Sequence, residues 1–422
     1  GAPTLPVAGS FDVKEAFMEV RIPIVEEGFL YNMSLEAGYR YSDYGLNNRN
    51  VSTDAYKIGL DLAPIRDVRF RVAYNRAVRA PNIQELFAPQ RVVLDGSTDP
   101  CAGIGVVGGV VAGGANLASC QAMGVSAAQF GTIQPNQASQ YNGLIGGNPN
   151  LEPEVADTWT VGIVLQPSFI PRLAITVDWF DIQVDSFIQG VGADTILQTC
   201  QNTLDPTFCG LVHRDQFGSL WRTSNGYVQD FSINIGSVKT RGIDVQASYS
   251  MEIGEGWGGV GFNFVGTWLD RLVTDNGVSD PYDCTGYFGP QCGTPSPEWR
   301  HQFRVNWNLP DGIGLTARWR YFSGVDVDGL SPNSTLHAFD TTSATARPAD
   351  FRIPSQSYID LTLTARIGDH YNFRLGVNNL FDRDPPLVGS NACPAGICNG
   401  NAYTQVYDAL GRYIFAGVSL DF

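Results

Sequence analysis

Apolar and polar residues alternate one by one along much of this chain. Ile359, Leu361 and Leu363 fall on one parity, and Asp360 and Thr362 fall on the other. Because successive side chains of a strand point to opposite faces, this pattern predicts strands with one apolar and one polar face. It recurs along the chain and predicts thirteen strands, at 11–24, 29–44, 54–63, 67–78, 154–166, 171–187, 228–250, 258–273, 298–309, 312–324, 355–368, 370–382 and 405–422.

The connections between these strands distinguish two kinds of β protein. Short turns alternate with long, polar, Gly-rich connections at about 79–153, 190–226, 274–297, 325–355 and 384–402. A short helix is expected only near residues 193–203. A soluble β-sandwich also has alternating strands, but we would expect shorter strands and no regular difference between its two ends. Short turns at one end and long loops at the other are typical of outer-membrane barrels.

Strand length and aromatic placement favour the same interpretation. Most of the predicted strands have about ten or more residues, which is enough to cross a bilayer when a strand is tilted. Tyr249, Trp319, Tyr321 and Tyr371 lie near strand ends, where an interfacial aromatic girdle would place them. The sequence therefore predicts an all-β fold, an antiparallel transmembrane β-barrel whose apolar face meets lipid.

The odd number of strands bears on how the barrel closes. Bacterial up-and-down barrels have an even number of strands, and an open edge in lipid would leave backbone groups unpaired. We therefore expect part of the sheet to lie outside this chain. The N-terminal residues show no basic segment followed by an apolar one, so we expect either a mature form or a chain that begins within a longer one.

Composition supports a membrane protein and excludes one class of partner. Only 16% of the 422 residues are charged, whereas soluble proteins carry about a quarter. The net charge of −15 argues against nucleic acid as a partner, because phosphate binding needs a basic surface. There is no run of about 18 apolar residues that would form a transmembrane helix.

The eight cysteines form four close pairs, all within the long connections. The pairs are Cys101/Cys120, Cys200/Cys209, Cys284/Cys292 and Cys393/Cys398. Even numbers in local pairs favour disulfides in an oxidising compartment. Free thiols and a zinc site are the alternatives, although only Cys209 has a histidine, His213, at ligand-like spacing.

Five segments together resemble one protein family. They are "NRAVRAPNIQELFAPQ" (75–90), "GNPNLEPEVADTWTVG" (147–162), "VKTRGIDVQASY" (238–249), "LGVNNLFDRDPP" (375–386) and the final "VSLDF" (418–422). In this order they are similar to TonB-dependent outer-membrane receptors. The resemblance implies a 22-stranded barrel occluded by an N-terminal plug. It also implies that the chain begins near the tenth strand, so we expect the plug, the TonB box and the first nine strands to be absent from it.

The resemblance also implies partners and a function. The receptor would take up a scarce ligand across the outer membrane, and the TonB complex would act through the plug. The barrel-assembly machinery would recognise the C-terminal strand with Phe422. A siderophore-like chelate, a cobalamin-like cofactor, an oligosaccharide and a peptide all remain open as ligands. Two other classes also remain, a passive pore or surface-structural barrel without a plug, and a soluble β-sandwich lectin.

Candidate contact residues lie after the fourth strand and in the long loops. Arg76, Arg79 and Glu85 either contact ligand or plug, or form an ion-pair network that fixes a loop to the lumen wall. Loop aromatics with polar neighbours offer stacking surface and hydrogen bonds to a ligand, although they can equally pack the loops together. The candidate ligand contacts are Arg214, Trp221, Arg222, Tyr227, Tyr282, Tyr287, Phe288, Phe351 and Arg352.

No motif predicts an enzyme, a cofactor or a metal site. Gly103, Gly105 and Gly108 match GxGxxG, but they lie in a loop and not between a strand and a helix. Asp326 and Asp328 lack the remaining ligands of a calcium loop. The four histidines have no catalytic or metal-binding spacing. The function that we expect is therefore transport without enzymatic activity.

Overall fold

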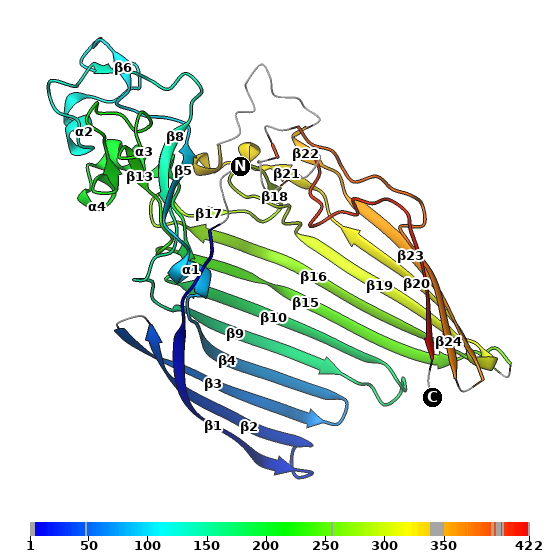
Figure 1. Ribbon diagram of the computed structural model, residues 1–422. Coiled ribbons are helices and arrows are strands. Elements are labelled where there is room, and N and C mark those ends of the chain that lie inside the picture. The colour runs from blue at the N-terminus through cyan, green and yellow to red at the C-terminus, as the bar shows by residue number, and fades with distance from the viewer. Residues whose placement is uncertain are drawn as a thin grey trace.

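One antiparallel sheet makes up most of the protein (Figure 1). The computed structural model describes residues 5–46, 49–254, 256–337, 350–368, 370–389, 392–393, 398 and 401–420. Thirteen strands pair in chain order, which confirms the predicted number: β1 (Phe11–Glu26), β2 (Asn32–Leu46), β3 (Arg49–Ile65), β4 (Val68–Arg79), β9 (Glu154–Leu165), β10 (Ala174–Asp185), β15 (Ser237–Glu252), β16 (Gly259–Asp275), β19 (Trp299–Asn308), β20 (Ile313–Phe322), β23 (Gln356–Ile367), β24 (Tyr371–Asn378) and β25 (Tyr413–Leu420). The short β17 (Tyr282–Asp283) adds to the end of β16.

Several strand boundaries differ from the prediction. β15 begins at Ser237 and not at 228, because Gly236 has a φ of 71° and a Cβ there would clash with the carbonyl oxygen of Asp275. β25 begins at Tyr413 and not at 405, after Gly411, whose φ is 65°. β2 ends at Leu46 and β3 begins at Arg49, so their connection is shorter than the predicted strand limits of 44 and 54 imply.

The register gives the sheet two faces of opposite character. Ala317, Leu361 and Val377 are partners across three strands on what we call the apolar face. Arg318 and Asp360 are partners on the opposite side, which we call the polar face. The alternation in the sequence thus corresponds to the two sides of the sheet, as predicted.

Buried apolar clusters lie mainly in the connections and not under the sheet. The largest one runs from Cys101 to Val228 within two long connections. The apolar face itself is open over many strands. Ile414 and Leu375 on it are 65% and 51% exposed. Such a large exposed apolar surface marks contact with a membrane or a partner and not with water.

The two ends of the sheet differ (Figure 1). At the lower end of the view, the strands are joined by tight turns, such as the one that holds η1 (Pro310–Gly312). At the upper end, long connections fold into helices and small sheets. Apart from the short β2–β3 connection, this is the predicted asymmetry.

The two longest connections fold together into a unit that we call the loop lobe, residues 91–145 and 188–230. Two disulfides, Cys101–Cys120 and Cys200–Cys209, close loops within it. Its α3 confirms the predicted helix. The lobe contains β5 (Arg91–Gly96), β6 (Gly103–Ile104), α2 (Leu117–Ala122), β7 (Thr132–Ile133), β8 (Tyr141–Ile145), β11 (Ile188–Gln189), α3 (Ala193–Thr203), α4 (Pro206–Cys209), β12 (Val212–His213) and β13 (Tyr227–Gln229). β14 (Ile233–Asn234) pairs with β11 and leads back to the main sheet.

The later connections form a second unit, which we call the loop cluster. It contains β18 (Tyr287–Phe288), β21 (Val325–Val327), η2 (Asp328–Leu330), η3 (Ser334–Leu336) and β22 (Arg352–Ile353). Cys284–Cys292 and Cys393–Cys398 are also bonded, so all four predicted disulfides are confirmed. No helix in the described ranges is both long and apolar enough to span a membrane. The predicted assembly signal, Phe422, lies outside the described residues.

Candidate functional site

The polar face of the sheet carries arginines that are paired with acids. Arg71 Nε donates to Asp178 Oδ1 at 2.7 Å. Arg320 bridges two carboxylates, since its Nη2 lies 3.0 Å from Asp360 Oδ1 and its Nη1 lies 2.8 Å from Asp408 Oδ1. The second of these bonds ties the last long connection to the wall. The register places on this face Arg40, Arg71, Arg304, Arg318, Arg320, Arg366 and Arg374.

At the rim, two of the three predicted motif residues form an ion-pair network. Arg79 Nε donates to Glu154, and Arg79 Nη1 lies 3.0 Å from Glu85 Oε2. Glu85 also accepts from the Asn82 backbone at 2.7 Å, which completes the capping box of α1 (Ile83–Phe87). The other oxygen of Glu154 accepts from the Ile188 backbone at 2.7 Å. Charge-assisted bonds of this kind fix the start of both long connections to the rim.

Arg76 lies on the opposite face from Arg79, in contrast to our expectation that the motif lines the lumen. It is the register partner of Tyr56 and Asp157 on the apolar face. Its Nε and Nη2 donate to the two oxygens of Asp157 at 2.9 and 2.7 Å. Tyr74 and Trp159 pack beside this pair with ring centroids 4.9 Å apart. Arg76 therefore belongs to an aromatic belt at the edge of the apolar face.

In the loop lobe, Arg214 is a buried structural residue. Its guanidinium forms a two-point ion pair with Asp99, with distances of 2.9 and 2.8 Å, and both side chains are at most 2% exposed. The same guanidinium donates to the carbonyl oxygens of Met123 and Gly218 at 3.0 and 2.8 Å. These four bonds hold the guanidinium inside the lobe, where Arg214 stabilises the fold.

The other three candidates of the lobe are partly accessible. Trp221 is half-buried, and its Nε1 donates to the Gln134 carbonyl at 3.1 Å. Arg222 is exposed and lies over the Phe217 ring, 4.1 Å from its centroid. Tyr227 is half-buried against His213, with ring centroids 4.8 Å apart. Aromatic packing thus accounts for most of their contacts.

The remaining five candidates come together in the loop cluster. Tyr282 and Phe288 are buried, and the Tyr282 hydroxyl accepts from Gln291 Nε2 at 3.0 Å. Phe351 packs against the core that contains Phe288. Tyr287 is half-buried, whereas Arg352 is exposed and pairs with Asp326 at 3.2 Å. The nine candidates therefore belong to two separate units at one end of the sheet, and several of them are core residues.

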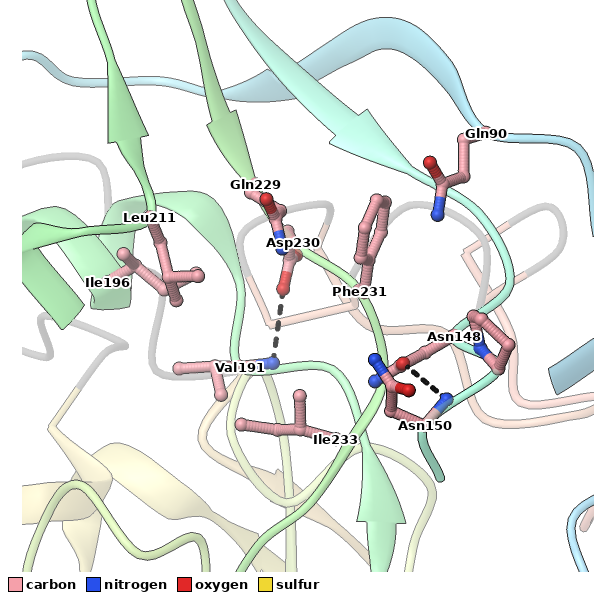
Figure 2. A pocket seen from close by; sticks show the side chains of 11 residues that line it. Gln90, Asn148, Asn150, Val191, Ile196, Leu211, Gln229, Asp230, Phe231 and Ile233 are labelled. Atoms are coloured by element: carbon pink, nitrogen blue, oxygen red, sulfur yellow. Dashed lines mark hydrogen bonds between the residues drawn. The ribbon is translucent and has the colours of Figure 1, made fainter. Parts of the chain in front are cut away.

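Sequence reasoning missed a cavity of about 260 Å³ where the loop lobe meets the rim (Figure 2). Its lining combines four amides, one carboxylate, one aromatic ring and an aliphatic floor. The polar and aromatic groups are Gln90, Asn148, Asn150, Gln229, Asp230 and Phe231. Figure 2 shows that they come from three segments that are far apart in the sequence.

The acid of this cavity is held in a fixed position. Asp230 Oδ1 accepts from the backbone N–H group of Val191 at 3.3 Å (Figure 2) and from that of Gly192 at 3.1 Å, at the start of α3. A second carboxyl, Asp95, lies close to it. Burial and the neighbouring Asp230 carboxylate raise the pKa of Asp95 to about 6. The described residues contain no group of three or more His, Cys, Asp or Glu that could hold a metal.

Some of the residues that line this cavity could have been found from the sequence. Gln90, Asn148 and Asn150 lie in two of the segments that carry the family resemblance. Gln229, Asp230 and Phe231 do not, because we assigned them to the start of a membrane strand. The membrane strand begins only after Gly236, so residues 229–231 belong to the connection before it and meet Gln90, Asn148 and Asn150 in one site.

Comparisons with known proteins agree with this geometry. The family described as TonB dependent receptor-like, beta-barrel matches residues 4–380. Among solved structures, a ferric enterobactin receptor mutant from Pseudomonas aeruginosa is similar, with a TM-score of 0.60 and 13% identity over 98% of this chain and 45% of that one. The siderophore receptor PirA from Acinetobacter baumannii gives a TM-score of 0.58 and 13% identity over 97% and 46%. A copper transporter, OprC, gives 0.51 and 14% over 98% and 48%. The chain thus spans about half the length of these structures. No curated protein sequence matches it significantly.

Proposed function

Because the chain belongs to the TonB-dependent receptor-like β-barrel family, we propose that it forms part of a receptor that takes up a scarce small ligand with energy from TonB. This family consists of non-enzymatic outer-membrane transporters of Gram-negative bacteria. The observation that carries the proposal is the sheet itself. One face is apolar and open, the other is lined with ion pairs, and folded loops gather at one end.

The complete barrel in this proposal has 22 strands. Among the described residues, β1 and β25 each pair on one side only. An unpaired strand edge in lipid costs several kcal/mol for each backbone group, so further strands are needed to join these two edges. A plug domain would then face the polar side of the sheet. Phe422 would serve as the signal for the barrel-assembly machinery.

Uptake would begin at the loop end. The loop lobe and the loop cluster would capture the ligand, and its binding would favour one arrangement of loops and plug over another. That shift would expose the coupling segment to TonB on the other side of the membrane. Arg320, which bridges the wall and the last long connection, would help to set this equilibrium.

The ligand in this proposal is a siderophore-like chelate or an oligosaccharide. Of the similar structures, one is a ferric enterobactin receptor, one is a siderophore receptor and one is a copper transporter. Their identity to this chain of 13–14% supports the shared fold and not a shared ligand. The choice between a siderophore-like chelate and an oligosaccharide must therefore be argued from the loops of this chain.

The test is ligand uptake by cells that produce the full-length receptor, compared with cells that lack TonB. We expect accumulation of a tightly bound ligand only when TonB is present. Equal uptake without TonB, together with open-channel conductance in planar bilayers, would favour the passive pore. If a tightly bound ligand is not taken up in either strain, the transport proposal is wrong.

A further inference from the structure

The cavity at the base of the loop lobe has the lining of a site for hydroxyl groups. Asn and Gln side chains each present a donor and an acceptor, which matches a pair of neighbouring hydroxyls. The carboxylate of Asp230 adds acceptors, and the Phe231 ring offers a flat apolar surface. An aliphatic floor with a few oriented polar groups is the usual composition of a small-molecule site. The floor consists of Val191, Ile196, Leu211 and Ile233.

Two of the amides are free to bind a ligand. The side chains of Gln229 and Asn150 make no hydrogen bond within the described part of the chain, although Gln229 is half-buried. Asn148 differs, because its amide is used at both ends. It accepts from Asn150 N at 2.9 Å and donates to the Ser232 carbonyl at 2.9 Å. Asn148 therefore fixes the loop at 148–150, and Asn150 on this loop and Gln229 at the end of β13 are left to bind a ligand.

The backbone that carries these groups is also fixed. Gln229 N donates to the Leu211 carbonyl at 2.8 Å, and Asp230 N donates to the Leu144 carbonyl at 3.0 Å. Gln90 Nε2 donates to the Gly147 carbonyl at 3.1 Å and holds the opposite wall. A site that is already arranged loses little entropy when a ligand binds.

Charge excludes the other common ligand classes. No Lys, Arg or His lines the cavity, and its one charged group is the acid Asp230. An anionic chelate or a phosphate would therefore meet repulsion without a counter-charge. A single carboxylate is also insufficient for a hard metal ion. A volume of about 260 Å³ lies just below the range of about 300–1,000 Å³ for drug-sized ligands, so it suits one ring-sized group.

We infer that this cavity binds one neutral sugar ring, as a unit of an oligosaccharide that the receptor captures. Gln229 and Asn150 hydrogen-bond the ring hydroxyls, Asp230 accepts from them, and Phe231 packs against the C–H face of the ring. The inference rests on the proposed uptake function, since the bound sugar is part of the cargo. Of the two proposed ligands, it favours the oligosaccharide and not the anionic chelate.

The test is calorimetric binding by the full-length receptor in detergent, without TonB. The probes are methyl glucoside, methyl galactoside, methyl mannoside, methyl xyloside, maltotriose and cellotriose. We expect at least one probe to bind and to protect the amides of residues 229–233 from hydrogen exchange. Q229L, which loses both hydrogen-bonding atoms, should bind that probe about tenfold more weakly. Phe231→Ala should weaken binding at least as much.

A matched control is available on the same lobe. Gln137 is exposed and lines no part of the cavity, so Q137L should bind like the unchanged receptor. Hydrogen exchange across α3 verifies that each variant keeps the lobe folded. If none of the six probes binds, or if Q229L and Phe231→Ala bind as well as Q137L, the inference is wrong. Because binding needs no TonB, sugar binding without uptake would contradict only the transport proposal.

Discussion

Single residues in the loop lobe show how a long connection becomes a folded unit. Arg214 and Asp99 are 115 positions apart in the sequence, and their ion pair is almost completely buried. Asp194 plays a similar part at the surface, because it accepts from the backbone N–H groups of both Ser97 and Thr98 at 3.0 Å. Such contacts join the first long connection to the second. The lobe is therefore one folded unit and not a pair of independent loops.

Loss of the buried ion pair should unfold the lobe selectively. Arg214→Met leaves the Asp99 carboxylate buried without its partner, which costs about 3–5 kcal/mol. We expect a matching fall in the free energy of local unfolding, measured by hydrogen exchange in α2 and α3, while the barrel strands stay protected. R222M is the control, because Arg222 is exposed. If both variants exchange alike, the ion pair does not stabilise the lobe.

The stability of the lobe should also depend on the titration of Asp95. Burial and Asp230 raise the pKa of Asp95 to about 6, above its value of about 4 in an unfolded chain. The folded lobe therefore binds this proton more tightly than the unfolded chain does. This stabilisation is complete below about pH 4 and is lost as the pH rises through about 6.

Replacement of this residue isolates its contribution to the pH profile. Asp95→Asn cannot ionise, so we expect it to be more stable than the unchanged lobe at pH 7 and to lack its stability change between pH 4 and 6. Hydrogen exchange of β5 and β8, corrected for the intrinsic pH dependence of exchange, measures both effects. Parallel pH profiles for the two proteins would contradict the assignment to Asp95.

At the scale of elements, each disulfide closes a loop within one of the two loop units. Its stabilising effect should therefore be limited to that unit. Cys101–Cys120 closes a segment with a sequence separation of 19, and loops of this length lose about 3 kcal/mol of stability without the cross-link. The double variant Cys101→Ser, Cys120→Ser should lower protection throughout the lobe. The equivalent change at Cys284 and Cys292 should affect only the loop cluster. Loss of protection in both units from either variant would show that they unfold together.

The elements also show what the sequence could predict. The thirteen strands were found because alternation over ten or more residues is a local signal, and their register follows from the side that is apolar. The strands of the lobe have two to six residues, and β8 pairs in parallel with β13 from a different connection. Contacts between distant segments stabilise them, so no local pattern reveals them. For the same reason the sequence did not reveal that Arg214 is paired with Asp99 in the core of the lobe.

For the molecule as a whole, negative charge is concentrated where the ligand would enter. The long connections, at 80–153, 186–236, 276–298, 323–355 and 379–412, carry 18 acidic residues against seven arginines and no lysine, in a chain whose net charge is −15. Two of these arginines are paired with acids, Arg214 with Asp99 and Arg352 with Asp326. The field at this end therefore repels anions over about one Debye length, roughly 8 Å at physiological salt.

This field should appear in the salt dependence of ligand association. An anionic ferric catecholate should associate with the full-length receptor slowly at low ionic strength, and its rate should rise as added salt screens the loops. A neutral oligosaccharide that binds should associate at a rate that salt changes little. Stopped-flow association at about 10 and 150 mM NaCl compares the two, because the Debye length falls from about 30 to 8 Å over this range. A catecholate that associates faster at low salt would mean that basic groups elsewhere in the receptor dominate its approach, and it would return the anionic chelate to first place among the ligands.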